Sequence, residues 1–274
     1  MGETIKLNLF ECARCCIDAA GVEEKLRLTR RCARAWREGH IDSTATAGPD
    51  PIAAPGRPVR PVLVHPSRVK PRKLATRQGM ASFLHALAHI EFNAINLAWD
   101  AVYRFRGMPA EFYTDWIRVA DEEAHHFSLL NQRLEDLGQA YGDFPAHDGL
   151  WHMARETAHD ILVRMALVPR VLEARGLDVT PAMIVRLQQA GDAESAAVLE
   201  TILHDEIGHV QAGTHWFQYV CRQRDLDPLE TFRSLLAEYA PGRIRAPFNT
   251  GARQQAGFGS DEMVLLEELA RSRR

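Results

Sequence analysis

The stretch "RVADEEAHHFSLL" (residues 118–130) sets acids and histidines inside an otherwise apolar helical pattern. Glu122 follows Asp121, and His125 stands three residues after Glu122. Residues three apart on a helix share one face, so Glu122 and His125 can reach one metal ion together. Iron and manganese accept a carboxylate with an imidazole better than thiolate-preferring metals do. The stretch therefore predicts half of a metal site on a long helix.

A second stretch, "TILHDEIGHVQAG" (201–213), repeats this order of residue types. Asp205 precedes Glu206, and His209 stands three residues after Glu206. A single Glu-x-x-His pattern is weak evidence because two fixed residues often meet at that spacing by chance. Two copies of Asp-Glu-x-x-His favour two metal-ligating faces over the alternative, which is charges on solvated helix surfaces.

Two isolated glutamates supply the further acids that such a site needs. Glu91 lies in "LAHIEFNAINLAW" and Glu173 lies in "LVPRVLEARGL". An acid in a buried helix stripe is costly unless it is paired or ligated. Glu91 precedes Glu122 by 122 − 91 = 31 residues, and Glu173 precedes Glu206 by 206 − 173 = 33 residues. The chain therefore contains two similar helical hairpins.

Glu173 has a competitor in "ARETAHDIL", which contains Glu156 and His159. Glu156 and Glu173 are 173 − 156 = 17 residues apart. On a straight helix they would be separated by about 25 Å and could not serve one site. The similarity of the two hairpins favours Glu173 as the ligand and leaves Glu156 with His159 as a satellite polar pair.

Long helical patterns dominate the chain from residue 78 and predict an all-α fold. No strand pattern of comparable length occurs. Breaks at Gly107, Gly138 and Gly191 separate the patterns, and Gly176 with Thr180-Pro181 is expected to interrupt the third helix. The predicted helices cover residues 78–105, 109–137, about 150–190 and 193–223. They define a four-helix domain over residues 78–225.

The flanking segments have a different composition. Residues 1–77 combine one or two short helices over 3–38 with a proline-rich arm, and residues 226–274 are expected to pack a helix and tail on the bundle. The tail "GRIRAPFNTGARQQAGFGS" is expected to gate the substrate or to be disordered. A solvated arm wrapping the body is favoured over nucleic-acid contact for the basic residues Arg57, Arg60, Arg68, Lys70, Arg72 and Lys73.

Composition sets further bounds. A net charge of −3 argues against broad nucleic-acid binding. No apolar run approaches the roughly 20 residues that span a bilayer, and no signal peptide is expected. The odd count of five cysteines indicates a reducing, cytoplasmic setting rather than a disulfide framework. Cys12-x-x-Cys15 has no second pair for a zinc site, so small buried side chains are the favoured interpretation.

One Glu on each of two helices and Glu-x-x-His on the other two resembles the ferritin-like di-metal carboxylate proteins. The phrases "HALAHIEFNAINLAWDAVYRF", "VPRVLEARGLDVTP" and "DEIGHVQAG" resemble in particular an uncharacterised bacterial ferritin-like family, a domain of unknown function, from about residue 50 onwards. The resemblance implies a four-helix bundle and a metal site. Its ligands would be Glu91, Glu122, His125, Glu173, Glu206 and His209.

The aspartate before each pair has a physical use. A ligating histidine usually donates its other ring N–H to an acceptor that fixes the orientation of the ring. Across a bundle, Asp121 would serve His209 and Asp205 would serve His125. The remaining histidines of these helices are expected to be ordinary core or surface residues; they are His85, His89, His126 and His204.

The predicted site carries two metal ions, iron first, with manganese or a mixed pair as alternatives. A reduced iron pair can bind O2 and oxidise a C–H bond, so an oxygenase, hydroxylase or oxidase is the first functional prediction. The substrate would be a small molecule or a modified nucleoside, with an unknown electron donor. Iron storage or detoxification without an organic substrate, and a bundle that keeps metal only for stability, are the alternatives. The oligomeric state stays open, with a homodimer as one option.

Overall fold

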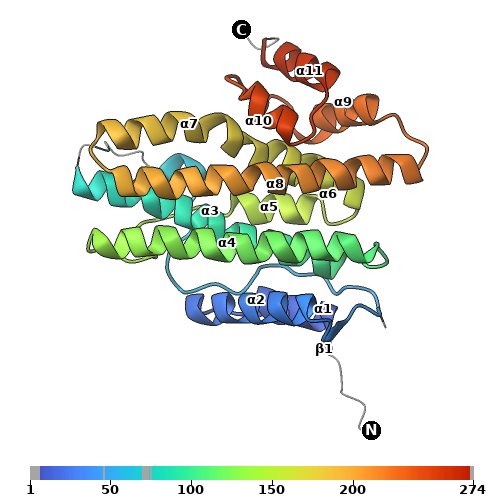
Figure 1. The fold of residues 1–274 in the computed structure, drawn as a ribbon, viewed down its shortest axis with the longest axis horizontal. Helices are drawn as coiled ribbons and strands as arrows, with labels where there is room; N and C mark the ends of the chain where they lie inside the picture. The colour runs from blue at the N-terminus through green and yellow to red at the C-terminus, as the bar shows by residue number, and fades with distance from the viewer. Residues whose placement is uncertain (1–6, 46, 70–73, 75, 272–274) are drawn as a thin grey trace. The chain divides into compact units, whose positions relative to one another are not determined.

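The computed structural model describes residues 7–45, 47–69, 74 and 76–271 (Figure 1). The regular secondary structure of the described residues is helical apart from one parallel pair of two-residue strands, β1 (Leu7–Asn8) and β2 (Ile41–Asp42), and an isolated bridge between Leu63 and Ala146. This confirms the all-α class. The chain divides into two compact units, Met1–Arg155 and Glu156–Arg274. No helix in the described part of the chain is long and apolar enough to cross a membrane.

The first unit is built on an antiparallel helical hairpin of α3 (Arg77–Arg104) and α4 (Ala110–Asp136). The Thr76 side chain caps α3 by accepting a hydrogen bond of 3.0 Å from the amide of Gly79. Gly107 has a φ of 81°, which an L side chain rarely adopts, and it turns the chain into α4. The sequence placed both helices within one residue of these bounds.

Two shorter helices, α1 (Leu9–Asp18) and α2 (Val22–Arg37), pack on this hairpin. Lys25 of α2 is fully buried, and its ammonium donates a hydrogen bond of 2.7 Å to Oδ1 of Asn96 in α3. It also donates to the carbonyl oxygens of Cys16 and Ile17 at 2.7 and 3.0 Å. These three acceptors satisfy a cation that burial would otherwise make costly.

The described part of the proline-rich arm runs along the first unit and contains one short 3-10 turn, η1 (Pro66–Arg68). The amide of Gly56 donates to the carbonyl of Ile17 at 2.8 Å. A Cβ at position 56 would lie 2.0 Å from the carbonyl oxygen of Asp18, so only glycine permits this approach. Trp151 of α5 (Gly149–Glu156) donates to the carbonyl of Ala53 at 3.1 Å. Lys70, Arg72 and Lys73 of the expected basic arm lie outside the described residues.

The second unit contains the other hairpin, in which α7 (Ala174–Gln189) packs against α8 (Ala193–Gln223). Gly191, with a φ of 81°, makes the turn, and Asp192 caps α8 by accepting from the amide of Ser195 at 2.9 Å. The bounds predicted for the fourth helix are therefore confirmed. The assembly of the two hairpins into a ferritin-like four-helix bundle stays a prediction.

The predicted break in the third helix was in the wrong place. Pro181 and Gly176 lie inside α7, and the chain breaks instead at residues 157–160, before α6 (Ile161–Leu167). A π-helical segment, η2 (Val168–Glu173), then joins α6 to α7. Its Pro169 packs on Gly213 of α8, where a Cβ would lie 2.2 Å from the proline ring. The π-helical segment η2 therefore packs against α8. The expected break at Pro181 followed from the low helix propensity of proline, but α7 accommodates this proline.

Residues after α8 fold onto the second unit as α9 (Pro228–Tyr239), α10 (Thr250–Gln255) and α11 (Ser260–Arg271). Arg253 of α10 is bound by the carboxylate of Asp178 in α7 at 2.8 and 2.9 Å. Arg170 of η2 is fully buried, forms an ion pair with Glu262 of α11 and stacks on aromatic rings. Those rings are Phe217, Phe232 and Phe258, with centroids 4.6, 4.0 and 4.6 Å from the guanidinium carbon.

Candidate metal site

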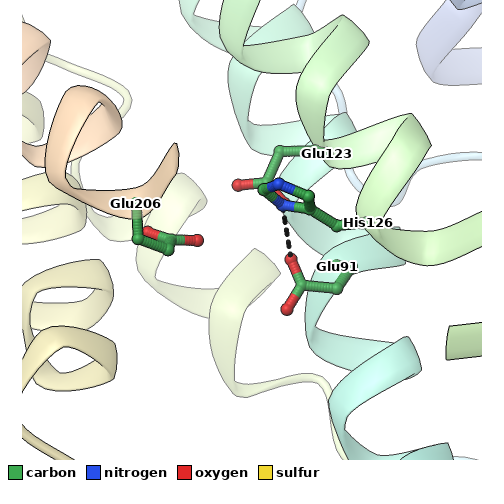
Figure 2. Close-up of side chains that lie close together, drawn as sticks. All are labelled: Glu91, Glu123, His126 and Glu206. Atoms are coloured by element: carbon green, nitrogen blue, oxygen red, sulfur yellow. Dashed lines mark ion pairs between the residues drawn. The ribbon is translucent and has the colours of Figure 1, made fainter. Parts of the chain in front are cut away.

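Three ionisable side chains meet in the interior of the first unit. Glu91 comes from α3, and Glu123 and His126 come from α4 (Figure 2). The Nδ1 atom of His126 lies 3.7 Å from Oε2 of Glu91 and 3.5 Å from Oε2 of Glu123. The side chains of His126 and Glu123 are 0% exposed and that of Glu91 is 6% exposed. The cluster is thus almost closed to water.

The phase of α4 brings Glu123 into this interior. Trp116, Ala120, Phe127 and Leu130 are buried, and Glu123 continues the same alternation of three- and four-residue steps. That stripe packs against α3, whose buried face carries Glu91. An acid on each of two packed helices therefore faces the other across the core of the first unit.

Glu122 and His125, which were assigned as ligands from the sequence, lie outside this cluster. Glu122 has a 31% exposed side chain and forms an ion pair of 2.8 Å with Arg118. His125 is exposed. The segment "DEEAHH" contains two overlapping Glu-x-x-His pairs, and the structure buries the second, Glu123 with His126. The pair assigned from the sequence is thus one residue out of register with the buried cluster, and His126, expected to be an ordinary core or surface histidine, is a member of that cluster.

A signal in the sequence could have identified the buried pair. Adjacent residues of a helix point about 100° apart, so Glu122 and Glu123 cannot both lie in the apolar stripe. Only Glu123 falls in step with the stripe that runs from Trp116 to Leu130. The separation from Glu91 then becomes 123 − 91 = 32 residues, closer to the 33 residues between Glu173 and Glu206 in the second hairpin.

Asp121, expected to orient a ligating histidine, makes a contact of its own within the first unit. Its carboxylate accepts a hydrogen bond of 3.0 Å from Nη1 of Arg37, a residue of α2. This contact ties α2 to α4 on the face of α4 that carries Glu122 and His125. Within the first unit, Asp121 therefore holds two helices together and does not contact the buried cluster.

The second unit holds the other predicted pair, Glu206 and His209 of α8. Nδ1 of His209 lies 3.7 Å from Oε1 of Glu206, and their side chains are 0% and 12% exposed. Oε2 of Glu206 is buried and accepts no hydrogen bond from the described residues. Figure 2 also labels this glutamate. Glu173 is the last residue of η2, which packs against α8, and one of its carboxylate oxygens is buried. Asp205 is partly exposed.

Burial and repulsion shape the charges of the first cluster. Burial raises the pKa of Glu91 well above its ordinary value, and the neighbouring carboxylate of Glu123 raises it further. Burial by itself would lower the pKa of His126, but the carboxylates of Glu123 and Glu91 raise it to about 11. Both shifts favour a bound proton: burial and the Glu123 carboxylate favour it on Glu91, and the two carboxylates favour it on His126.

The donor set fits a hard or borderline divalent cation. Two carboxylates and one imidazole offer oxygen and nitrogen ligands, and one atom of each lies within 4.8 Å of the others. Ligand atoms about 2.1 Å from one ion lie up to about 4.2 Å apart, by the bond lengths of zinc sites. The separations of 3.5 and 3.7 Å around Nδ1 fall in that range and exceed the usual length of a hydrogen bond. The residues present could therefore hold a metal ion.

Other histidines behave as ordinary core residues, as expected. His85 is 1% exposed, and its Nε2 accepts a hydrogen bond of 2.9 Å from the amide of Gly142. His89 contacts the hydroxyl of Tyr141 at 2.8 Å. Burial lowers the pKa of each of these imidazoles to about 4, so both are neutral near pH 7.

The satellite pair expected on the third helix does not share one helix. Glu156 is the last residue of α5, whereas His159 lies in the break before α6. The ring of His159 stacks on Tyr239 of α9, and its Nε2 lies 3.3 Å from the tyrosine hydroxyl. Because of this break, Glu156 and Glu173 do not lie on one straight helix.

Comparison with known proteins places the chain in a family. Residues 18–264 match the family described as "Protein of unknown function (DUF455)". The chain is also 50% identical over 219 residues to an uncharacterized protein of Haemophilus influenzae, covering 77% of this chain and 76% of that protein. No solved structure matches it. The chain belongs to the DUF455 family, which confirms the resemblance to an uncharacterised family, while membership of the ferritin-like superfamily stays a prediction.

Proposed function

We propose that this member of the DUF455 family is a ferritin-like di-metal protein that activates O2 to oxidise an organic substrate. The buried cluster of Glu91, Glu123 and His126 is the observation that carries the proposal. Ionisable groups withdrawn from water destabilise a fold unless protons, partners or a metal ion offset their charge. A divalent cation would replace the protons that these acids otherwise retain.

The second half of the centre would come from Glu173, Glu206 and His209. The two hairpins carry the same residue types in the same order, with acid-to-acid separations of 123 − 91 = 32 and 206 − 173 = 33 residues. Two ions bridged by carboxylates in a four-helix bundle need this duplicated set of ligands. Asp205 remains the candidate for orienting a ligating histidine. Iron is the favoured metal, with manganese or a mixed pair as alternatives.

Bound iron would supply the electron transfers that allow O2 to react with a C–H bond or another electron-rich group. In a hydroxylation, one oxygen atom enters the substrate C–H bond and the other leaves as water, with two electrons from an external donor and two protons from solvent. The role of the chain is to hold the ligands and to keep water away. The low exposure of Glu91, Glu123 and His126 suits that role. The raised pKa of Glu91 suits its carboxylate to holding a proton when no cation is bound.

Iron storage or detoxification without an organic substrate is the second candidate. A cage subunit needs a compact helical unit whose outer faces can meet other copies. Here α1 and α2 cover the α3–α4 hairpin, and α10 lies against α7 and α8 of the other hairpin. These additional layers favour an enzyme over a cage subunit. A centre that only stabilises the fold is the third candidate.

The decisive experiment loads metal-free protein with Fe(II) under anaerobic conditions, counts the bound iron and then follows O2 consumption with a reductant. We expect about two irons per chain and repeated turnover. Glu123→Gln with His126→Ala should lose iron, whereas the matched control Glu122→Gln with His125→Ala, one residue away, should keep it. Less than a tenth of an equivalent of iron in wild type would refute the metal site. Consumption that stops after one turnover would point to storage or a structural centre instead.

A further inference from the structure

The outer face of α4 forms one wall of an open groove, and α2 forms the other. The groove has a volume of about 800 Å3 and belongs entirely to the first unit. Its α4 wall contains His125 and two acids, Asp121 and Glu122. Its α2 wall contains Arg27, Arg30, Arg31, Arg34 and Arg37.

The arginines of α2 form a continuous row. From Arg27 to Arg37 they are separated by three, one, three and three residues, which keeps them near one face of the helix. With a rise of about 1.5 Å per residue, the row is about 15 Å long. All five side chains are exposed. The row is therefore an extended strip of positive charge at the surface of the first unit.

Two members of the row attach α2 to α4. Nη2 of Arg30 donates to Oγ of Ser128 at 2.7 Å, and Nη1 of Arg37 binds Asp121 at 3.0 Å. The other three, Arg27, Arg31 and Arg34, make no ion pair or side-chain hydrogen bond within the described part of the chain. These three guanidinium groups are available to a ligand.

The acids of the groove do not cancel this charge. Asp121 is bound by Arg37 at 3.0 Å and Glu122 by Arg118 at 2.8 Å. Glu23 is the remaining acid of the lining, against three unengaged arginines. The groove is thus locally positive in a chain whose net charge is −3. A local field of this kind attracts an anionic ligand whatever the net charge of the protein.

We propose that this groove binds the phosphodiester backbone of a single-stranded nucleic acid. Guanidinium groups bind phosphate oxygens in a bidentate manner. A lone phosphate would require donors that converge on one point, whereas a row suits an anion whose charge repeats along its length. The groove is comparable in size to sites that enclose one drug-sized ligand, which suits a few nucleotides of a single strand.

An acidic protein segment is the competing occupant, and the composition of the groove argues against it. The centres of protein interfaces are enriched in aromatic side chains, methionine and arginine, packed into pockets from which water is excluded. The exposed large hydrophobic residues of the described chain include none from α2 or α4. Leu26, the apolar residue of the lining, is buried. The groove therefore offers charge without an apolar anchor, which suits a phosphate backbone.

Fluorescence anisotropy with labelled 15-nucleotide oligothymidylate and oligouridylate tests the proposal on the full-length protein. We expect affinity to fall steeply between about 50 and 200 mM salt because binding releases counterions. The triple variant Arg27→Gln, Arg31→Gln, Arg34→Gln should bind at least tenfold more weakly at low salt. Its salt slope should fall by about 2, since each phosphate contact with a single strand contributes about 0.7.

A matched control makes the same change in charge elsewhere. Arg186, Arg222 and Arg243 are exposed residues of the second unit, and their replacement by Gln should change the affinity less than twofold. The triple variant Arg27→Lys, Arg31→Lys, Arg34→Lys should keep most of the salt slope, which separates loss of charge from loss of fold. No binding at 50 mM salt, an equal loss in the control, or equally tight competition by a polyglutamate peptide would overturn the proposal.

Discussion

His125 and His126 are consecutive residues of α4 with opposite surroundings. Nδ1 of His126 lies 3.5 Å from Glu123 and 3.7 Å from Glu91 in the interior of the first unit. His125 is exposed and lines the groove against α2. Helix α4 thus separates a buried cluster of acids from a surface row of arginines. A substitution on one face can therefore be compared with the same substitution at the adjacent residue on the other face.

The first prediction uses this pairing to locate the ligands. Glu123→Gln removes a fully buried carboxylate and should reduce bound metal by at least one ion per chain, as measured by elemental analysis after Fe(II) loading. Glu122→Gln, which alters the partly exposed ion pair with Arg118 outside the cluster, should retain the wild-type content. Equal metal content in the two variants would show that the cluster of Glu91, Glu123 and His126 is not the binding site.

The second prediction concerns metal removal. Metal-free protein should remain folded but melt at a lower temperature than the loaded protein at the same pH, because the acids lose their cation. At free metal near 100 times Kd, the difference corresponds to about 2.7 kcal/mol, or roughly 5–10 °C for a domain of this size. In His126→Ala the difference in melting temperature between metal-loaded and metal-free protein should be smaller. An unchanged difference would exclude His126 as a ligand.

The third prediction follows from His85, a buried histidine of α3. Burial lowers its pKa to about 4, below the ordinary 6.5, so the unfolded chain binds its proton first as the pH falls. The stability from neutral His85 is complete above pH 6.5 and declines towards pH 4, by at most about 1.4 kcal/mol per pH unit. Denaturant unfolding of metal-free wild type and His85→Gln between pH 7 and 5 should show a shallower decline in the variant. If the stability of wild type and of His85→Gln declined equally with falling pH, neutral His85 would not be the source of this pH dependence.

The fourth prediction tests the attachment of α10 to α7. Asp178→Ala leaves Arg253 buried without its carboxylate and should destabilise the second unit by about 3–5 kcal/mol, the usual cost of breaking a buried pair. Limited proteolysis should then cleave the chain between α9 and α10 faster than in wild type. The double variant Asp178→Leu, Arg253→Met should recover much of the stability lost in Asp178→Ala, because no charged group is left buried without a partner. Unchanged proteolysis in Asp178→Ala would show that this ion pair does not hold the segment.

The sequence by itself determined the helices and the residue types of the site. Caps at Thr76 and Asp192 and left-handed glycines at positions 107 and 191 act within a few residues, so the bounds of α3, α4 and α8 follow from local patterns. The pair of Glu206 and His209 also follows from spacing alone, since no second Glu-x-x-His overlaps it.

Tertiary structure decided which overlapping pair is buried. Glu122 with His125 and Glu123 with His126 both satisfy the three-residue spacing, and they differ by one step of about 100° around the helix axis. Packing of α4 against α3 selects the second pair, because the buried stripe from Trp116 to Leu130 can face only one way. The break in the third helix also lies elsewhere than expected, since Pro181 lies within α7 and the Asp160 side chain caps α6 instead.

The arginine row of α2 also depends partly on the sequence and partly on tertiary packing. The sequence contains the row, but only the packing of α2 on α4 makes it one wall of a groove. Arg30 and Arg37 are engaged by Ser128 and Asp121, residues more than 80 positions away, whereas Arg27, Arg31 and Arg34 stay available. Local rules set where a helix begins and which residues share its face. The neighbour that each face meets depends on contacts between distant segments, which only the folded chain brings together.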